Sequence, residues 1–176
     1  MTLTAREAWA VIHGMCLGGI FLLAFAGGIA DLWSLRRELL SPEGIRERMF
    51  RLMVGTWAMA GTAWVTVLSG TYVVYIWYRA KPPEGADLAD FPRAYLLDHP
   101  GLKGWHSFGM EWKEHAAWLA PILATAVAWV VTRYRGQLVD EKKLRWMVMA
   151  LFALAFCAAG VAGLFGAFIT KAAPIH

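Results

Sequence analysis

Four long apolar stretches limit what this chain can fold into more than any other feature. They cover residues 8–33, 52–77, 115–131 and 144–170 of the 176-residue sequence. A helix needs about 20 apolar residues to cross the hydrocarbon layer of a membrane. With 59% hydrophobic residues and a mean hydropathy of +0.46, the chain is also too apolar for a soluble domain. We therefore expect an all-α membrane protein with one domain over residues 1–176, folded as an up-down bundle of four transmembrane helices.

Positive charge gathers in two short loops between these stretches, and this pattern predicts the orientation of the bundle. Ten of the 17 lysines and arginines lie there: Arg36, Arg37, Arg46, Arg48, Arg51, Arg133, Arg135, Lys142, Lys143 and Arg145. Short loops rich in lysine and arginine stay in the cytoplasm. We therefore expect a multi-pass protein of the bacterial inner membrane with both termini in the periplasm. The net charge of +4 then reflects topology, and no nucleic-acid partner is expected.

The same orientation places a long loop, residues 79–114, on the outer side. Its first part is rich in proline, glycine and acids, while the part from Phe91 to Trp112 is aromatic enough to cap the mouth of the bundle. The third span, which follows, contains Pro121. Because proline lacks a backbone N–H, the carbonyl of Ala117 loses its helical partner, and we expect a bend there.

Two histidines in the apolar stretches are the most informative residues for function. His13 lies inside the first span and His115 opens the third. An ionisable side chain in lipid is costly and tends to pair or to bind something. In a four-helix bundle the first and third helices are diagonal neighbours, roughly 11–14 Å apart, which suits imidazole–iron–imidazole ligation of one b-type haem. The alternative is that both rings only form hydrogen bonds across the bundle or to loop carbonyls.

This arrangement resembles the small four-helix membrane cytochromes b of bacterial electron-transfer systems. The resemblance rests on His13 and His115 in parallel spans and on the neighbouring Gly14 and Gly18, and it covers the bundle but not the outer loop. It implies electron transfer through one haem near the outer face, with quinol or a periplasmic cytochrome as partner. Such families often carry a second histidine pair at the opposite face, and the inner side of this sequence has no histidine.

Further residues complete the predicted site. The glycines of the first span make room for a macrocycle or serve only tight helix packing. Four cations of the outer face are candidates for binding the haem propionates: Lys113, Arg93, Arg6 and Lys171. His106 lies among aromatic residues and is a reserve haem ligand, whereas His99 and His176 are expected to be solvated.

Other sites and functions stay open. His106 and His115, with Glu111 and Glu114, have the ligand chemistry of a non-haem metal site. Aromatic residues near the outer end of the second span predict an interfacial belt, with a quinone site as the alternative: Tyr72, Tyr75, Trp77 and Tyr78. Cys16 and Cys157 each lie in an apolar run, outside any motif for c-type haem or an iron–sulfur cluster. The alternative to electron transfer is a non-catalytic accessory subunit that packs against other membrane subunits of a respiratory or photosynthetic complex.

Overall fold

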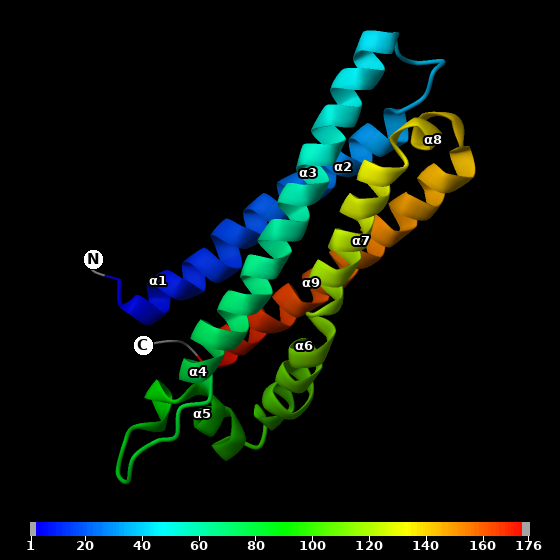
Figure 1. Ribbon diagram of the computed structural model, residues 1–176. Helices are drawn as coiled ribbons and strands as arrows, with labels where there is room; N and C mark the ends of the chain where they lie inside the picture. Colours follow the sequence, from blue (N-terminus) through cyan, green and yellow to red (C-terminus); the bar gives the residue numbers. More distant parts are fainter. Residues whose placement is uncertain (1–2, 174–176) are drawn as a thin grey trace. The chain divides into compact units, whose positions relative to one another are not determined.

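A computed structural model describes residues 3–173 of the chain, and these residues form helices without any strand (Figure 1). Four helical segments are long and apolar enough to cross a membrane: Ala5–Ser34, Pro42–Tyr78, Trp105–Arg133 and Lys142–Ala172. The predicted all-α class is therefore confirmed, and each of the four expected spans corresponds to one of these helical segments. His176 lies outside the described residues.

Three of the four spans are built from shorter elements, because each of these three contains a turn with i→i+5 hydrogen bonding. The first consists of α1 (Ala5–Val11), η1 (Ile12–Cys16) and α2 (Leu17–Ser34), and the second of α3 (Pro42–Ser69), η2 (Gly70–Val74) and α4 (Tyr75–Tyr78). The third consists of η4 (Trp105–Met110), α6 (Glu111–Ala116) and α7 (Leu119–Arg133). The fourth is α9 (Lys142–Ala172), and η3 (Leu88–Asp90), α5 (Pro92–Asp98) and α8 (Arg135–Asp140) lie in the connections.

The first helix begins where local side-chain chemistry can satisfy its free N–H groups. The Thr4 hydroxyl accepts a hydrogen bond from the Glu7 N–H at 3.2 Å, and the Glu7 carboxylate accepts one from the Thr4 N–H at 2.7 Å. This reciprocal pair is a capping box. It fixes the start of α1 near Ala5, slightly before the apolar stretch itself begins.

The second and third spans start earlier than their apolar stretches predict. The second begins at Pro42, and the third at Trp105, so the end of the expected outer loop is helical. Charged residues continue a helix beyond its apolar part when their polar ends can reach water, which hydropathy alone does not reveal. The predicted interruption before Pro121 is present, because the residues between α6 and α7, Ala117 and Trp118, form a turn.

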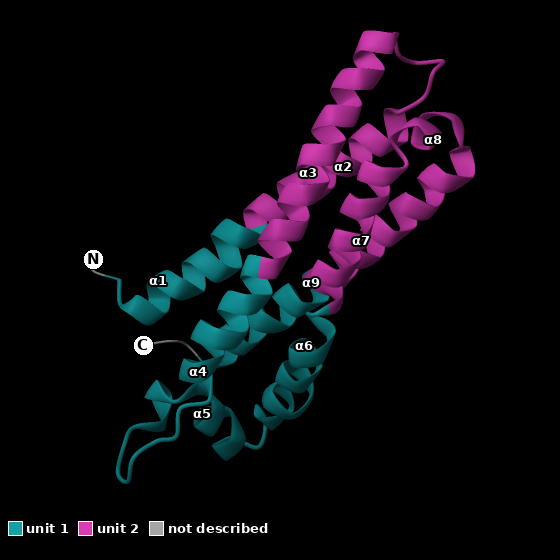
Figure 2. Cartoon of the chain, in the orientation of Figure 1, with its two compact units in different colours: residues 1–18, 65–118, 160–176 teal, residues 19–64, 119–159 magenta. Residues whose placement is uncertain are grey.

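The chain groups into two compact units, which are shown in different colours in Figure 2. Unit 2 comprises residues 19–64 and 119–159. Its core includes Leu52, Met59, Val127 and Phe152, each at most 1% exposed. Burial of such side chains is the main packing contribution within the unit.

Unit 1 comprises residues 1–18, 65–118 and 160–176, and it contains all the described histidines. Its core joins Tyr78, Leu96, Met110 and Ile169, which come from α4, α5, η4 and α9. Leu96 is fully buried. The aromatic half of the outer connection thus packs as a cap within unit 1, as its composition predicts.

Candidate functional site

Unit 1 contains three turns with i→i+5 hydrogen bonds, and polar side chains of the unit gather around them. The first such turn, η1, carries His13, and the second, η2, begins at Gly70 directly beneath the imidazole. A third, η4, carries His106. Turns of this kind inside α-helices occur frequently at functional sites, because the extra residue re-aims neighbouring side chains.

His13 is held by α3 and packs tightly over the second span. Its Nδ1 lies 3.1 Å from the Ser69 hydroxyl, and its ring is close enough that a Cβ added at Gly70 would meet Cε1 at 2.8 Å. Real Cβ atoms do not approach a neighbour so closely, so only glycine fits at position 70 while the ring keeps this place. Gly70 therefore permits the close contact between the first and second spans at His13.

The hydrogen bonds of Ser69 determine which nitrogen of His13 carries the proton. The Ser69 hydroxyl donates to the Thr66 carbonyl at 3.1 Å, so its oxygen accepts from His13. The donor must then be Nδ1–H, and Nε2 of the neutral ring keeps its lone pair. This is the tautomer that a histidine needs in order to bind a metal through Nε2.

His115 has the same tautomer for a different local reason. Its Nδ1 donates to the Glu111 carbonyl at 2.7 Å, one helical turn earlier, and its side chain is exposed. Nε2 therefore carries a free lone pair at the surface of the chain. No hydrogen bond or ring contact joins His13 to His115 within the described part of the chain.

His106 is the most buried histidine described, at 6% exposure, and both of its ring nitrogens are engaged. Nδ1 lies 2.8 Å from the Tyr78 hydroxyl, and the Arg93 Nε–H donates to Nε2 at 3.3 Å. Since Nε2 accepts, Nδ1 is the protonated nitrogen and donates to Tyr78. The ring has no free lone pair for a metal, so we assign it a structural part in the cap.

Tyr78 and Tyr72 differ in environment although both belong to the predicted aromatic belt. Tyr72 is 65% exposed, as a residue of such a belt should be, whereas Tyr78 is 6% exposed and bonded to His106. The prediction is therefore wrong for Tyr78. The two rings lie six residues apart and so point to different faces of the helix, one exposed and one in the core, and a cluster in the sequence does not reveal this.

Two adjacent charged residues of α6, Lys113 and Glu114, lie in unit 1. The Lys113 ammonium lies over Gly166 of α9, where an added Cβ would be 3.0 Å from Nζ, and it is near enough to His13 to act on that ring electrostatically. The Glu114 Oε1 atom is buried and is the one such side-chain atom in the described chain with no hydrogen-bond partner. Buried charge of this kind inside a membrane span is typical of functional sites.

The predicted glycine surface is open on the first span. A Cβ added at Gly14 or Gly18 would meet nothing within 4 Å. Neither glycine is therefore explained by packing inside the described chain, and both leave space for something that lies against the helix. Gly14 directly follows His13.

The predicted non-haem site is not assembled. Within residues 3–173 no three His, Cys, Asp or Glu side chains are grouped so that they could hold a metal ion. The Glu111 carboxylate lies 4.0 Å from the Arg79 guanidinium instead, while its backbone carbonyl serves His115. His99, expected to be solvated, is exposed, and its Nδ1 donates to the Tyr95 carbonyl at 2.8 Å.

No family model, no curated protein and no solved structure matches the chain.

Two partners in this site could not be found from the sequence. Ser69 and Tyr78 are ordinary polar residues near the end of an apolar span, where many such residues bond only to the preceding turn. Their roles depend on which helix faces which, and no local pattern encodes that. The buried position of Glu114 depends on tertiary packing in the same way.

Proposed function

We propose that the protein is a membrane electron-transfer subunit that holds one b-type haem through His13 and His115. The observation that supports it best is the matched hydrogen bonding of the two rings. Each donates Nδ1–H to a protein oxygen, and each keeps the Nε2 lone pair that an axial haem ligand requires.

Residues around the two histidines have the chemistry that a haem pocket needs. Gly14 and Gly18 leave open space at their own positions on the first span, where a flat macrocycle would meet no side chain of those two residues. Lys113 supplies a positive charge beside His13, and Arg93 has terminal nitrogens beyond the Nε that it gives to His106. Arg6 and Lys171 are further candidates to bind the propionates. When bound, the haem would supply one-electron redox chemistry.

The proposal includes an orientation and partners. With the basic loops in the cytoplasm, both termini and unit 1 face the periplasm of a bacterial inner membrane. Electrons would then be exchanged with quinol or with a periplasmic redox protein. His106 and Tyr78 would keep the cap folded over this end of the bundle and take no part in ligation.

The test is the absorption spectrum of the purified protein, oxidised and dithionite-reduced, for the wild type and three variants. We expect a Soret band and a b-type α-band in the wild type, and loss of most haem in both His13→Ala and His115→Ala. His99→Ala is the matched control, because its ring is exposed and donates Nδ1–H to the i−4 carbonyl as His115 does. A wild type without the α-band, or equal loading of all three variants, would refute the proposal.

A second function, that of a non-catalytic accessory subunit, is favoured by a different observation. Glycines on two spans of unit 1 have open space where a side chain would be: Gly14, Gly18, Gly160 and Gly163. Surfaces of small residues let helices of other chains approach closely in a membrane. Copurification with partner chains and no bound cofactor would support this function, whereas a stable haem-bearing monomer would exclude it.

A further inference from the structure

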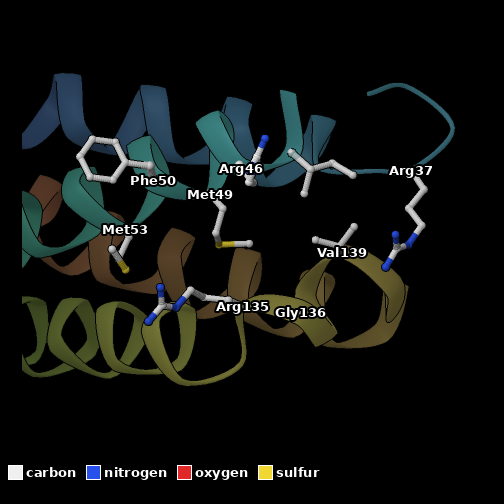
Figure 3. A pocket seen from close by; sticks show the side chains of 9 residues that line it. Arg37, Arg46, Met49, Phe50, Met53, Arg135, Gly136 and Val139 are labelled. Carbon is white, nitrogen blue, oxygen red and sulfur yellow. The ribbon is translucent and has the colours of Figure 1, made fainter. Parts of the chain in front are cut away.

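A surface pocket in unit 2, lined by no histidine, lies where α3 faces α8. Its volume is about 370 Å³, within the range of sites for small ligands. Figure 3 shows side chains of α3 on one side, among them Met49 and Met53, and Arg135 of α8 on the other. Both elements belong to the same compact unit.

The pocket combines an apolar floor with a basic rim. Met49, Met53 and Phe50 line it, and Phe50 is 63% exposed although it is a large apolar side chain. Guanidinium groups come from three elements of the rim: Arg37, Arg46 and Arg135. A ligand that fits both parts carries an anion joined to an apolar chain.

The guanidinium groups differ in how far their charge is already neutralised. Arg37 is bonded to the Asp140 carboxylate through two nitrogens. Arg46 contacts Glu43 at 3.3 Å, but both side chains are more than 70% exposed, and such a surface pair contributes little. Arg135 uses only its Nε, which donates to the Thr132 carbonyl at 3.1 Å, and no carboxylate of the described chain lies within ion-pair distance of it. An anion therefore has free donors on Arg135 and an easily displaced partner on Arg46.

The surroundings of the pocket favour a lipid over a soluble anion. Residues 34–51 and 133–145 hold ten lysines and arginines but five acids, so this end of unit 2 is strongly positive. Met49 and Met53 lie in the candidate span Pro42–Tyr78, close to its basic end. Phospholipid headgroups lie at this depth, and basic pockets between spans bind anionic headgroups there.

From this geometry we infer that the pocket between α3 and α8 binds one anionic phospholipid. Arg135 binds the phosphate, and the exposed Arg46 side chain, which points away from Arg135 in Figure 3, turns towards it. The acyl chains lie along Met49, Met53 and Phe50. The site is independent of any haem in unit 1. Its ligand class is a phospholipid with a net negative charge, such as phosphatidylglycerol.

Native mass spectrometry of the full-length protein in detergent tests this inference. The probes are phosphatidylglycerol, phosphatidylcholine and soluble glycerol 3-phosphate, each titrated separately. We expect one tightly bound phosphatidylglycerol per chain, and much weaker binding of the other two. Equal binding of phosphatidylcholine would overturn the inference, and so would equal binding of glycerol 3-phosphate, which would indicate a site for a free anion.

A double variant and a matched control distinguish binding in the pocket from general attraction to basic charge. The double variant Arg46→Gln/Arg135→Gln should weaken phosphatidylglycerol binding roughly 25-fold, since each basic residue near the headgroups contributes about fivefold. The control Arg133→Gln/Lys143→Gln removes the same charge outside the pocket and should change binding little. An equal loss in both double variants would show diffuse attraction and overturn the inference.

A steric variant keeps every charge in place. A Cβ at Gly136 would meet nothing within 4 Å, so Gly136→Leu should fold normally while it fills the pocket. We expect it to lose the bound phosphatidylglycerol as the double arginine variant does. Unchanged binding by a folded Gly136→Leu protein would overturn the inference. A lipid-free dimer that the double arginine variant abolishes would also overturn the inference, because the pocket would then bind a second copy of the chain.

Discussion

Replacing Gly70 by alanine tests the placement of His13, on which the candidate site depends. The new Cβ would lie 2.8 Å from Cε1 of the imidazole, whereas ordinary contacts begin near 3.4 Å. The ring must therefore move by about 0.6 Å or the two helices must separate. Either movement lengthens the 3.1 Å contact between His13 Nδ1 and the Ser69 hydroxyl.

The size of the effect follows from three contributions. Overpacking of this kind costs about 1–3 kcal/mol. Loss of the hydrogen bond to Ser69 costs about 0.5–1.5 kcal/mol. The higher helix propensity of alanine offsets about 1 kcal/mol of these two losses. We expect Gly70→Ala to lower the free energy of unfolding by about 0.5–3.5 kcal/mol in total.

The assay is equilibrium unfolding in mixed micelles, followed by circular dichroism. Gly61→Ala is the matched control, because Gly61 lies on the same span and an added Cβ there meets nothing within 4 Å. It should be neutral or stabilising by up to about 1 kcal/mol. The double variant Gly70→Ala/His13→Ala should be less unstable than the sum of its single variants, since the clash is gone. Equal stability of Gly70→Ala and Gly61→Ala would refute the reasoning.

Two other predictions each concern a pair of polar residues, one pair in unit 1 and one in unit 2. Tyr78→Phe removes the acceptor of the buried His106 Nδ1–H and should destabilise the protein by about 1–3 kcal/mol. Adding His106→Phe to the Tyr78→Phe variant should cost little more, because the hydrogen bond is already lost. Losses that add up in the double variant would contradict the pairing. In unit 2, the hydrogen bond from Arg37 holds the pKa of Asp140 below its usual value of 3.8. Ionised Asp140 therefore stabilises the fold above about pH 4, and this contribution is lost as the pH falls through the lowered pKa. Asp140→Asn should thus lower the melting temperature at pH 7 and match the wild type in acid below the lowered pKa of Asp140. A difference that persists in strong acid would contradict the assignment.

The fold was largely predictable because membrane spans are encoded locally. The apolar stretches, the capping box at Thr4 and the interruption before Pro121 each depend on a few neighbouring residues. The start of the third span at Trp105 was not predictable in the same way. Its first turns contain polar residues whose helical state depends on packing against α5 and α9.

The site was predictable only in its residue types. Burial cost alone singles out His13 in an apolar span. The partners that fix its tautomer and orientation, Ser69 and Gly70, come from another helix, and single-sequence patterns carry no information on that pairing. For the same reason His106 was a reserve ligand on sequence grounds, although Tyr78 and Arg93 occupy its nitrogens.

The electron paramagnetic resonance spectrum of the oxidised, purified protein is the most direct test that His13 and His115 share one iron. Our account predicts a low-spin ferric signal of bis-imidazole type in the wild type, absent from His13→Ala and His115→Ala. A high-spin signal, or protein purified with no haem iron at all, would contradict it.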